Sequence, residues 1–168
     1  MKKLLVYSLL AAVLVGNSGA GCGSAKSDDV TPTDKAFLRM KINGKTWTAT
    51  TKINGVALKG IIGFGGNLGK ENFSVLINGS ETPGTYTIAQ SANGSTAAYA
   101  SDAGGSLNGA YFSTRAPGSS LTVRVTRTNG LSVAGTFSGT LGLEAAFGTG
   151  TAGPTTVTIT DGEFSTIE

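Results

Sequence analysis

The sequence predicts an all-β fold, an antiparallel β-sandwich or barrel of about nine to eleven strands, preceded by an N-terminal signal peptide and a flexible linker. The chain has 26 glycines among 168 residues but only 4 prolines, and β-branched residues recur in short alternating blocks between the glycines. After the leader, no segment keeps an apolar period of 3.6 over the length that a helix needs. The length suits one domain with its own core, which we assign to residues 36–168.

Residues 1–21 have the three parts of an export signal peptide. Lys2 and Lys3 give a positive start, Leu4–Val15 is an apolar run, and small residues follow as far as Gly21. A membrane-spanning helix needs roughly 20 apolar residues, so this run is too short to predict one. We therefore expect residues 1–21 to be removed on export.

The single cysteine of the chain, Cys22, directly follows this leader. The stretch Ser18–Cys22 resembles the cleavage box of bacterial lipoproteins, in which signal peptidase II cuts just before a cysteine that receives lipid. Gly19 departs from the pattern, because leucine is usual there. The resemblance implies that Cys22 carries acyl chains such as palmitate and anchors the protein in the bacterial outer membrane. It leaves open whether the protein faces the periplasm or the cell surface.

Residues 22–35 comprise this cysteine and a flexible tether. The stretch is polar, contains Pro32 and shows no apolar periodicity, which is typical of a linker. The tether of about 13 residues has a root-mean-square reach of roughly 20 Å. That reach would lift a domain clear of the lipid headgroups.

The first half of the domain reads as hairpins and central strands. Residues 37–42 alternate, and Asn43–Gly44 predicts a type I′ turn. Asn54–Gly55 predicts a second turn of this kind, and the continuously apolar stretches 56–64 and 72–77 are expected to be central strands. The glycine-rich stretch 63–70 reads as a flexible hairpin loop. The residues expected to point inward from the first strand are Leu38, Met40 and Ile42.

Shorter strands are expected at 85–89, 96–100 and 109–114, followed by a clean alternation over 120–128 and a third Asn-Gly turn at Asn129–Gly130. The chain then continues in strands to its end, except that residues 144–148 (EAAFG) are expected to form one helical turn. The inward residues of the alternating strand are Leu121, Val123 and Val125.

Four stretches together resemble an uncharacterised family of small all-β lipoproteins found mainly in Bacteroidota. They are NGKTWTA at 43–49, GTYTI at 84–88, VAGTFSGTL at 133–141 and VTITDGEFS at 157–165. The resemblance covers most of the chain after the tether. It implies an all-β lipoprotein, and it brings no catalytic residues with it.

The residue types argue against an enzyme. The chain has no histidine, which excludes Ser-His-Asp and Cys-His arrangements and removes the commonest transition-metal ligand. We predict no catalytic residue, no metal site and no cofactor beyond the covalent lipid at Cys22. The glycine-rich stretch 63–70 does not match a phosphate-binding loop.

A carboxylate-dependent glycan hydrolase is the alternative, and it needs two facing carboxylates about 5 to 9.5 Å apart. Asp161 and Glu163 are the closest pair in the sequence, but they flank Gly162, which favours a turn or bulge in the last strand. The carboxylates of the domain are Glu71, Glu81, Asp102, Glu144, Asp161, Glu163 and Glu168.

The charge pattern argues against nucleic acid as a partner. The formal net charge of the whole chain is +3, and loss of the leader with Lys2 and Lys3 lowers it to +1. Arg124 and Arg127 are separated by an odd number of positions, so a regular strand would place them on opposite faces. A nucleic-acid footprint is normally a clustered basic stripe, and the sequence predicts none.

The sequence therefore predicts a lipid-anchored cell-envelope protein that acts as a non-catalytic binding or interaction module. Its partners would be the membrane, through the anchor, and an envelope or surface glycan or a protein. A lipocalin-like small-molecule carrier is a further alternative. An aromatic platform for sugars is conceivable, although packing roles are favoured for its candidates Trp47, Tyr86, Tyr99 and Tyr111.

Overall fold

The alternating blocks form eleven β-strands in the computed structural model, which describes residues 35–90, 93–102, 107–146 and 153–166. These ranges contain no helix, so the all-β prediction is confirmed. The predicted signal peptide, Cys22, nearly all of the tether, and Glu168 lie outside the described residues. The strands are β1 (Phe37–Ile42), β2 (Lys45–Thr48), β3 (Thr51–Leu58), β4 (Ile61–Leu68), β5 (Glu71–Asn78), β6 (Gly84–Ala89), β7 (Thr96–Ser101), β8 (Gly109–Phe112), β9 (Ser120–Asn129), β10 (Ser132–Ala145) and β11 (Thr156–Ser165).

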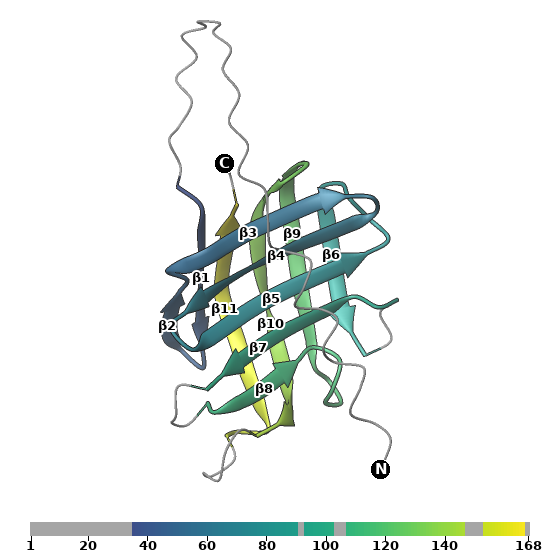
Figure 1. Cartoon of the computed structure of the whole chain (residues 1–168). Helices are drawn as coiled ribbons and strands as arrows, with labels where there is room; N and C mark the ends of the chain where they lie inside the picture. Colours follow the sequence, from purple (N-terminus) through teal and green to yellow (C-terminus); the bar gives the residue numbers. More distant parts are fainter. Residues whose placement is uncertain (1–34, 91–92, 103–106, 147–152, 167–168) are drawn as a thin grey trace, which may run out of the picture. The chain divides into compact units, whose positions relative to one another are not determined.

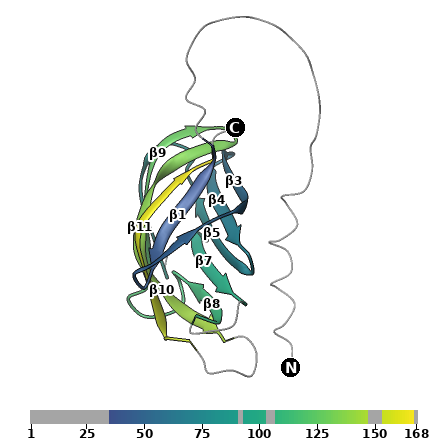
Figure 2. The ribbon, with the colours of Figure 1, turned by 90° about the vertical axis from the view of Figure 1, so that its left-hand side faces the viewer.

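All strands pair antiparallel in one curled sheet of order β2-β1-β11-β10-β8-β7-β5-β4-β3. The long strand β10 pairs with β9 over Ser132–Thr140 and with β8 over Gly142–Ala145, and β6 extends the β9 branch. The sheet therefore folds over itself at β10. Strands β3, β4, β5, β7 and β8 form one layer, and β1, β11, β10, β9 and β6 form the layer behind it (Figure 1). The turned view in Figure 2 shows the curvature of the sheet.

Aromatic side chains fill the space between the two layers. Phe64 of β4 stacks on Phe164 of β11 with ring centroids 3.7 Å apart. Phe73 of β5 stacks on Phe137 of β10 at 5.0 Å, so both stacks join one layer to the other. The inward residues predicted for the first strand and for β9 complete this core, because all six are at most 2% exposed.

The Asn-Gly prediction is correct at Asn43–Gly44, which forms the β1–β2 turn with positive φ angles of 49° and 80°. The Asn43 side chain also accepts a hydrogen bond from the Thr158 N–H at 2.8 Å, which ties the turn to β11. The third hairpin is also present, although Asn129 pairs with Ser132 and the loop residues are Gly130 and Leu131.

The prediction of a turn at Asn54–Gly55 is wrong, because both residues lie inside β3. The turn falls instead at Lys59–Gly60, with φ angles of 56° and 75°. The stretch 56–64 is therefore the hairpin of β3 and β4, not one central strand. Stretch 63–70, expected as a flexible loop, is mostly strand β4, and only Gly69–Lys70 forms a turn.

A strand end and a register shift correct two smaller expectations, and a bulge confirms a third. Glu144 and Ala145, expected to start a helical turn, are the last residues of β10. The bulge predicted beside Gly162 is confirmed, because the β11 register shifts there against both neighbouring strands. A further shift in the β9–β10 register falls between Val125 and Arg127 and breaks the alternation, so that Arg124 and Arg127 are both exposed.

Candidate functional site

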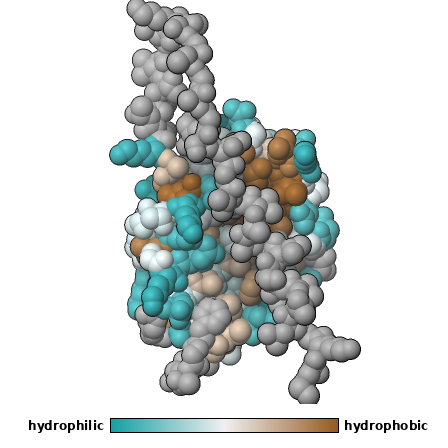
Figure 3. Space-filling view, in the orientation of Figure 1, coloured by the Kyte–Doolittle hydropathy of each residue, from teal (hydrophilic) through white to brown (hydrophobic). Residues whose placement is uncertain are grey.

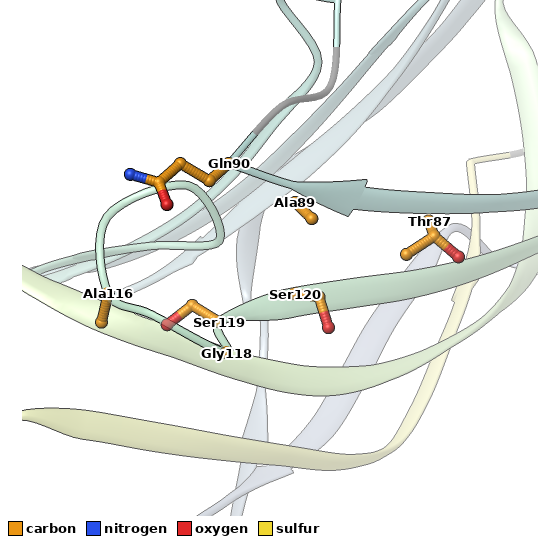
Figure 4. A pocket seen from close by; sticks show the side chains of 7 residues that line it. All are labelled: Thr87, Ala89, Gln90, Ala116, Gly118, Ser119 and Ser120. Atoms are coloured by element: carbon orange, nitrogen blue, oxygen red, sulfur yellow. The ribbon is translucent and has the colours of Figure 1, made fainter.

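A hollow on the domain surface lies between the end of β6 and the connection from β8 to β9. Ala116–Pro117–Gly118–Ser119 forms a turn in which the Ser119 N–H donates to the Ala116 carbonyl at 2.9 Å. Proline at the second position and Gly118 at the third, with φ of +80°, are the residues that a type II turn requires. This turn forms one wall of the hollow, and β6 forms the other (Figure 4).

The hollow, which we call the β6 groove, has a volume of about 670 Å³ and opens to solvent. Its polar groups are hydroxyls, an amide and backbone atoms. No residue of its lining is ionisable. The lining residues are Thr87, Ala89, Gln90, Ala116, Gly118, Ser119 and Ser120.

The wall that the 116–119 turn forms is held by close packing on β10. A Cβ added to Gly142 would lie 2.3 Å from the Ala116 Cβ and 2.9 Å from the Ser119 Oγ. Glycine at this position therefore lets the turn settle onto β10. Beside the turn, Arg115 forms an ion pair with Glu144 of β10, with 2.9 Å between Nε and Oε2.

Ser119 is the most deeply placed polar residue of the groove lining. It is 4% exposed, and its Oγ is buried without a hydrogen-bond partner among the described residues. An unpaired buried hydroxyl costs about 1–3 kcal/mol relative to a paired one.

Strand β6 adds backbone groups to the same region. It pairs with β9 along one edge, and no described strand pairs with its other edge. Thr85 and Thr87 are both exposed on β6, and of these two only Thr87 lines the groove. Ala89 and Ser120, which both line the groove, pair with each other, so the groove lies along the paired edge of β6.

The sequence-predicted carboxylates lie elsewhere. Asp161 and Glu163 are on the outer surface of the β11 bulge, with side chains 65% and 44% exposed, and each forms an ion pair with β1. Lys41 pairs with Asp161 at 2.9 Å, and the Arg39 Nε donates to Glu163 at 2.9 Å. These two carboxylates therefore hold the bulge to the neighbouring strand.

Of the remaining described carboxylates, Glu71 and Glu81 accept hydrogen bonds, and Glu144 forms the ion pair with Arg115. The Glu81 carboxylate accepts a hydrogen bond from the Gly60 N–H at 3.1 Å. The structure also brings Glu71 and Asp102 to adjoining strand ends, since Glu71 pairs with Ser101 and the Asp102 N–H donates to the Lys70 carbonyl at 3.3 Å. Glu71 accepts the Tyr99 hydroxyl at 3.0 Å.

The four aromatic candidates do not form a platform. Trp47, Tyr99 and Tyr111 are core residues, at most 3% exposed. Tyr86 is half-buried, and its hydroxyl is bonded to the Ser80 hydroxyl at 2.6 Å and to the Thr82 carbonyl. The structure therefore gives these four aromatic residues the packing roles that the sequence favoured.

The groove residues were not singled out from the sequence, because threonine, serine and alanine near turns are common. One local signal was available: the stretch APGS at 116–119 predicts a type II turn. It could not reveal that β6, 27 or more positions earlier, forms the opposite wall.

The described residues contain neither a membrane-spanning helix nor a metal site. No helix there is long and apolar enough to cross a membrane. Within the same ranges, no three His, Cys, Asp or Glu side chains gather in a way that could hold a metal ion.

Comparison with known proteins gives one match. Residues 34–168 match the family described as Domain of unknown function (DUF6252). No curated protein and no solved structure matches the chain.

Proposed function

The chain belongs to this family of uncharacterised domains, and we propose that it is a non-catalytic binding module anchored to the bacterial outer membrane by lipid at Cys22. The β6 groove carries the proposal for binding, because its lining offers hydrogen-bonding groups without an ionisable side chain. The lipoprotein pattern ending at Cys22 supports the anchor.

The groove chemistry favours a neutral polar ligand, and a glycan of the envelope or cell surface is the class we propose. Sugar hydroxyls both donate and accept hydrogen bonds, as do the hydroxyls of Thr87 and Ser120 and the amide of Gln90. The groove volume of about 670 Å³ is within the range of small-ligand sites.

Several contacts favour a binding role over hydrolysis. General acid and base work needs a titratable group at the site, and the groove lining has none. Asp161 and Glu163 are engaged with Lys41 and Arg39 on an exposed surface. The aromatic stacks between the layers occupy the interior that a lipocalin-like carrier would leave open.

The binding proposal is tested on a glycan array with the full-length lipidated protein in detergent. Thr87→Trp would fill the groove, and we expect it to weaken the best glycan signal by at least about tenfold. Thr85→Trp is the matched control, because Thr85 is the same residue type, is also exposed on the same strand and lies outside the groove. If Thr87→Trp binds as the wild type does, the groove is not the site.

The anchor is tested by metabolic labelling with an alkyne fatty acid, followed by cell fractionation and protease treatment of intact cells. We expect wild type to carry the label and stay with membranes, and Cys22→Ala to lose both properties. Cleavage of the anchored wild type would place it at the cell surface, whereas protection would place it in the periplasm. Identical soluble fractionation of both proteins would contradict the anchor.

A further inference from the structure

Four chain segments that are distant in sequence meet at the end of the domain where the tether joins it. Phe37, the first residue of β1, pairs with Ser165, and Ser165 pairs with Ala134 near the start of β10. The Ala57 N–H donates to the Gly130 carbonyl at 2.6 Å, which links the β3–β4 hairpin to the β9–β10 hairpin. Figures 1 and 2 both show these segments at one end, which we call the tether end.

The tether end carries the exposed large hydrophobic side chains of the described residues. They are Leu58 and Ile61, which face each other across the Lys59–Gly60 turn, and Leu131 in the neighbouring hairpin loop. Their exposed fractions are 51%, 36% and 59%. Figure 3 shows an apolar surface over the ends of β3 and β4 at this end. Two adjacent hairpin tips thus present apolar side chains to the exterior.

Three exposed cations belong to the chain segments that meet at this end. Lys59 lies in the β3–β4 turn, Lys35 lies two residues before β1, and Arg127 lies near the end of β9, all of them exposed. Such a combination of apolar tips and flanking cations is suited to an anionic lipid surface. Glu81 is the opposing charge, and its hydrogen bond to Gly60 places it beside the tip. Contact must therefore stay shallow, with this carboxylate at the level of the headgroups.

The length of the tether favours the same orientation. From Cys22 to Lys35 the chain has a root-mean-square reach of roughly 20 Å. Strand β10 has 14 residues and spans about 45 Å at roughly 3.3 Å per residue. Placing the opposite end of the domain on the membrane would require the tether to stretch to about its full length, whereas the tether end lies within its ordinary reach.

We propose that the tether end rests on the phospholipid bilayer that holds the Cys22 anchor, with Leu58, Ile61 and Leu131 in the headgroup boundary. This inference rests on the proposed anchor. It assigns an orientation in which the two hairpin tips face the lipid and the β1–β2 turn points away from it.

The test uses the full-length lipidated protein reconstituted into vesicles of phosphatidylethanolamine and phosphatidylglycerol that contain spin-labelled lipid. Cys22 is the only cysteine, so once its sulfur is in a thioether, an introduced cysteine is the sole free thiol for a fluorescent probe. Leu131→Cys places the probe at the tether end. Lys45→Cys is the matched control, because Lys45 is exposed beside the β1–β2 turn at the opposite end.

We expect quenching of the probe at position 131 to exceed that at position 45 by about threefold or more. Equal quenching in a protein that floats with the vesicles would overturn the orientation while leaving the anchor intact. Failure to float would overturn the anchor itself, and the orientation with it. The two failures are therefore distinguished by the flotation step.

A second variant separates the apolar tips from the tether. In the chain labelled through Leu131→Cys, Leu58→Ser together with Ile61→Ser removes the two large apolar side chains that remain at the tether end. We expect this double substitution to lower the quenching at position 131 by about half. Unchanged quenching would mean that the tether alone brings position 131 close to the bilayer, and it would overturn the apolar contact.

Discussion

Two buried tyrosines occupy neighbouring positions in the core but differ in how their hydroxyls are satisfied. Tyr99 and Tyr111 have ring centroids 6.1 Å apart. The Tyr99 hydroxyl donates to Glu71, whereas the Tyr111 hydroxyl is buried without a hydrogen-bond partner among the described residues. Burial raises the pKa of both phenols, and the hydrogen bond and charge of Glu71 raise the pKa of Tyr99 further.

These raised pKa values predict a loss of stability at alkaline pH. The unfolded chain releases the two phenol protons near the ordinary pKa of 10.0, whereas the folded chain holds them to higher pH. Their contribution is complete below pH 10 and falls as the pH rises through the folded pKa values. Urea titrations between pH 7 and pH 11 should show the free energy of unfolding falling above about pH 10.

Phenylalanine substitutions separate the two residues. At pH 7, Tyr99→Phe should lose about 1–2 kcal/mol with the Glu71 bond, while Tyr111→Phe should be neutral or stabilising because it removes an unpaired hydroxyl. Both variants should lose less stability than wild type between pH 10 and pH 11. An alkaline slope unchanged in both would show that other groups cause it.

At the scale of single elements, the Asn-Gly pairs predicted two hairpins correctly, but the pair Asn54–Gly55 lies inside a strand. Asn43–Gly44 forms its turn because both residues can adopt positive φ. Gly55 has another role: a Cβ there would lie 2.3 Å from the Thr166 Oγ1 and 2.5 Å from the Val133 Cγ2. The sequence cannot distinguish a glycine needed for a turn from one needed for a close tertiary approach, because the partner is distant in the chain.

The close approach at Gly55 predicts a large effect of one methyl group. Gly55→Ala would displace Thr166, whose Oγ1 accepts from the Val133 N–H at 2.9 Å, and should destabilise the domain by about 2–3 kcal/mol. Gly63→Ala is the control, because its Cβ would lie 3.3 Å from the Val56 Cγ1, a contact that only a small shift relieves. Thermal unfolding of both variants makes the comparison, and equal losses would refute the packing role of Gly55.

At the scale of the whole molecule, the sequence predicted strand content and inward faces, but not the way in which the sheet folds over itself. The alternation of Leu121, Val123 and Val125 is a local property, and all three are buried as expected. The exchange of partners along β10, from β9 to β8, depends on pairings between distant segments. The β6 groove arises beside this exchange, which explains why no short motif revealed it.

The aromatic stacks that join the two layers predict that the domain unfolds as one unit. The Phe73 ring packs between Trp47 of β2 and Phe137 of β10, with centroid distances of 6.5 Å and 5.0 Å. It therefore connects the only tryptophan of the chain to the core between the layers. Tryptophan fluorescence and far-UV circular dichroism should therefore report the same urea midpoint.

Phe73→Ala should lower the free energy of unfolding by about 3–5 kcal/mol and shift both signals together. Leu131→Ala, at an exposed position, should change it by less than about 0.5 kcal/mol. A fluorescence transition that preceded the loss of strand signal would mean that β2 and its neighbours unfold separately from the β9–β10 region.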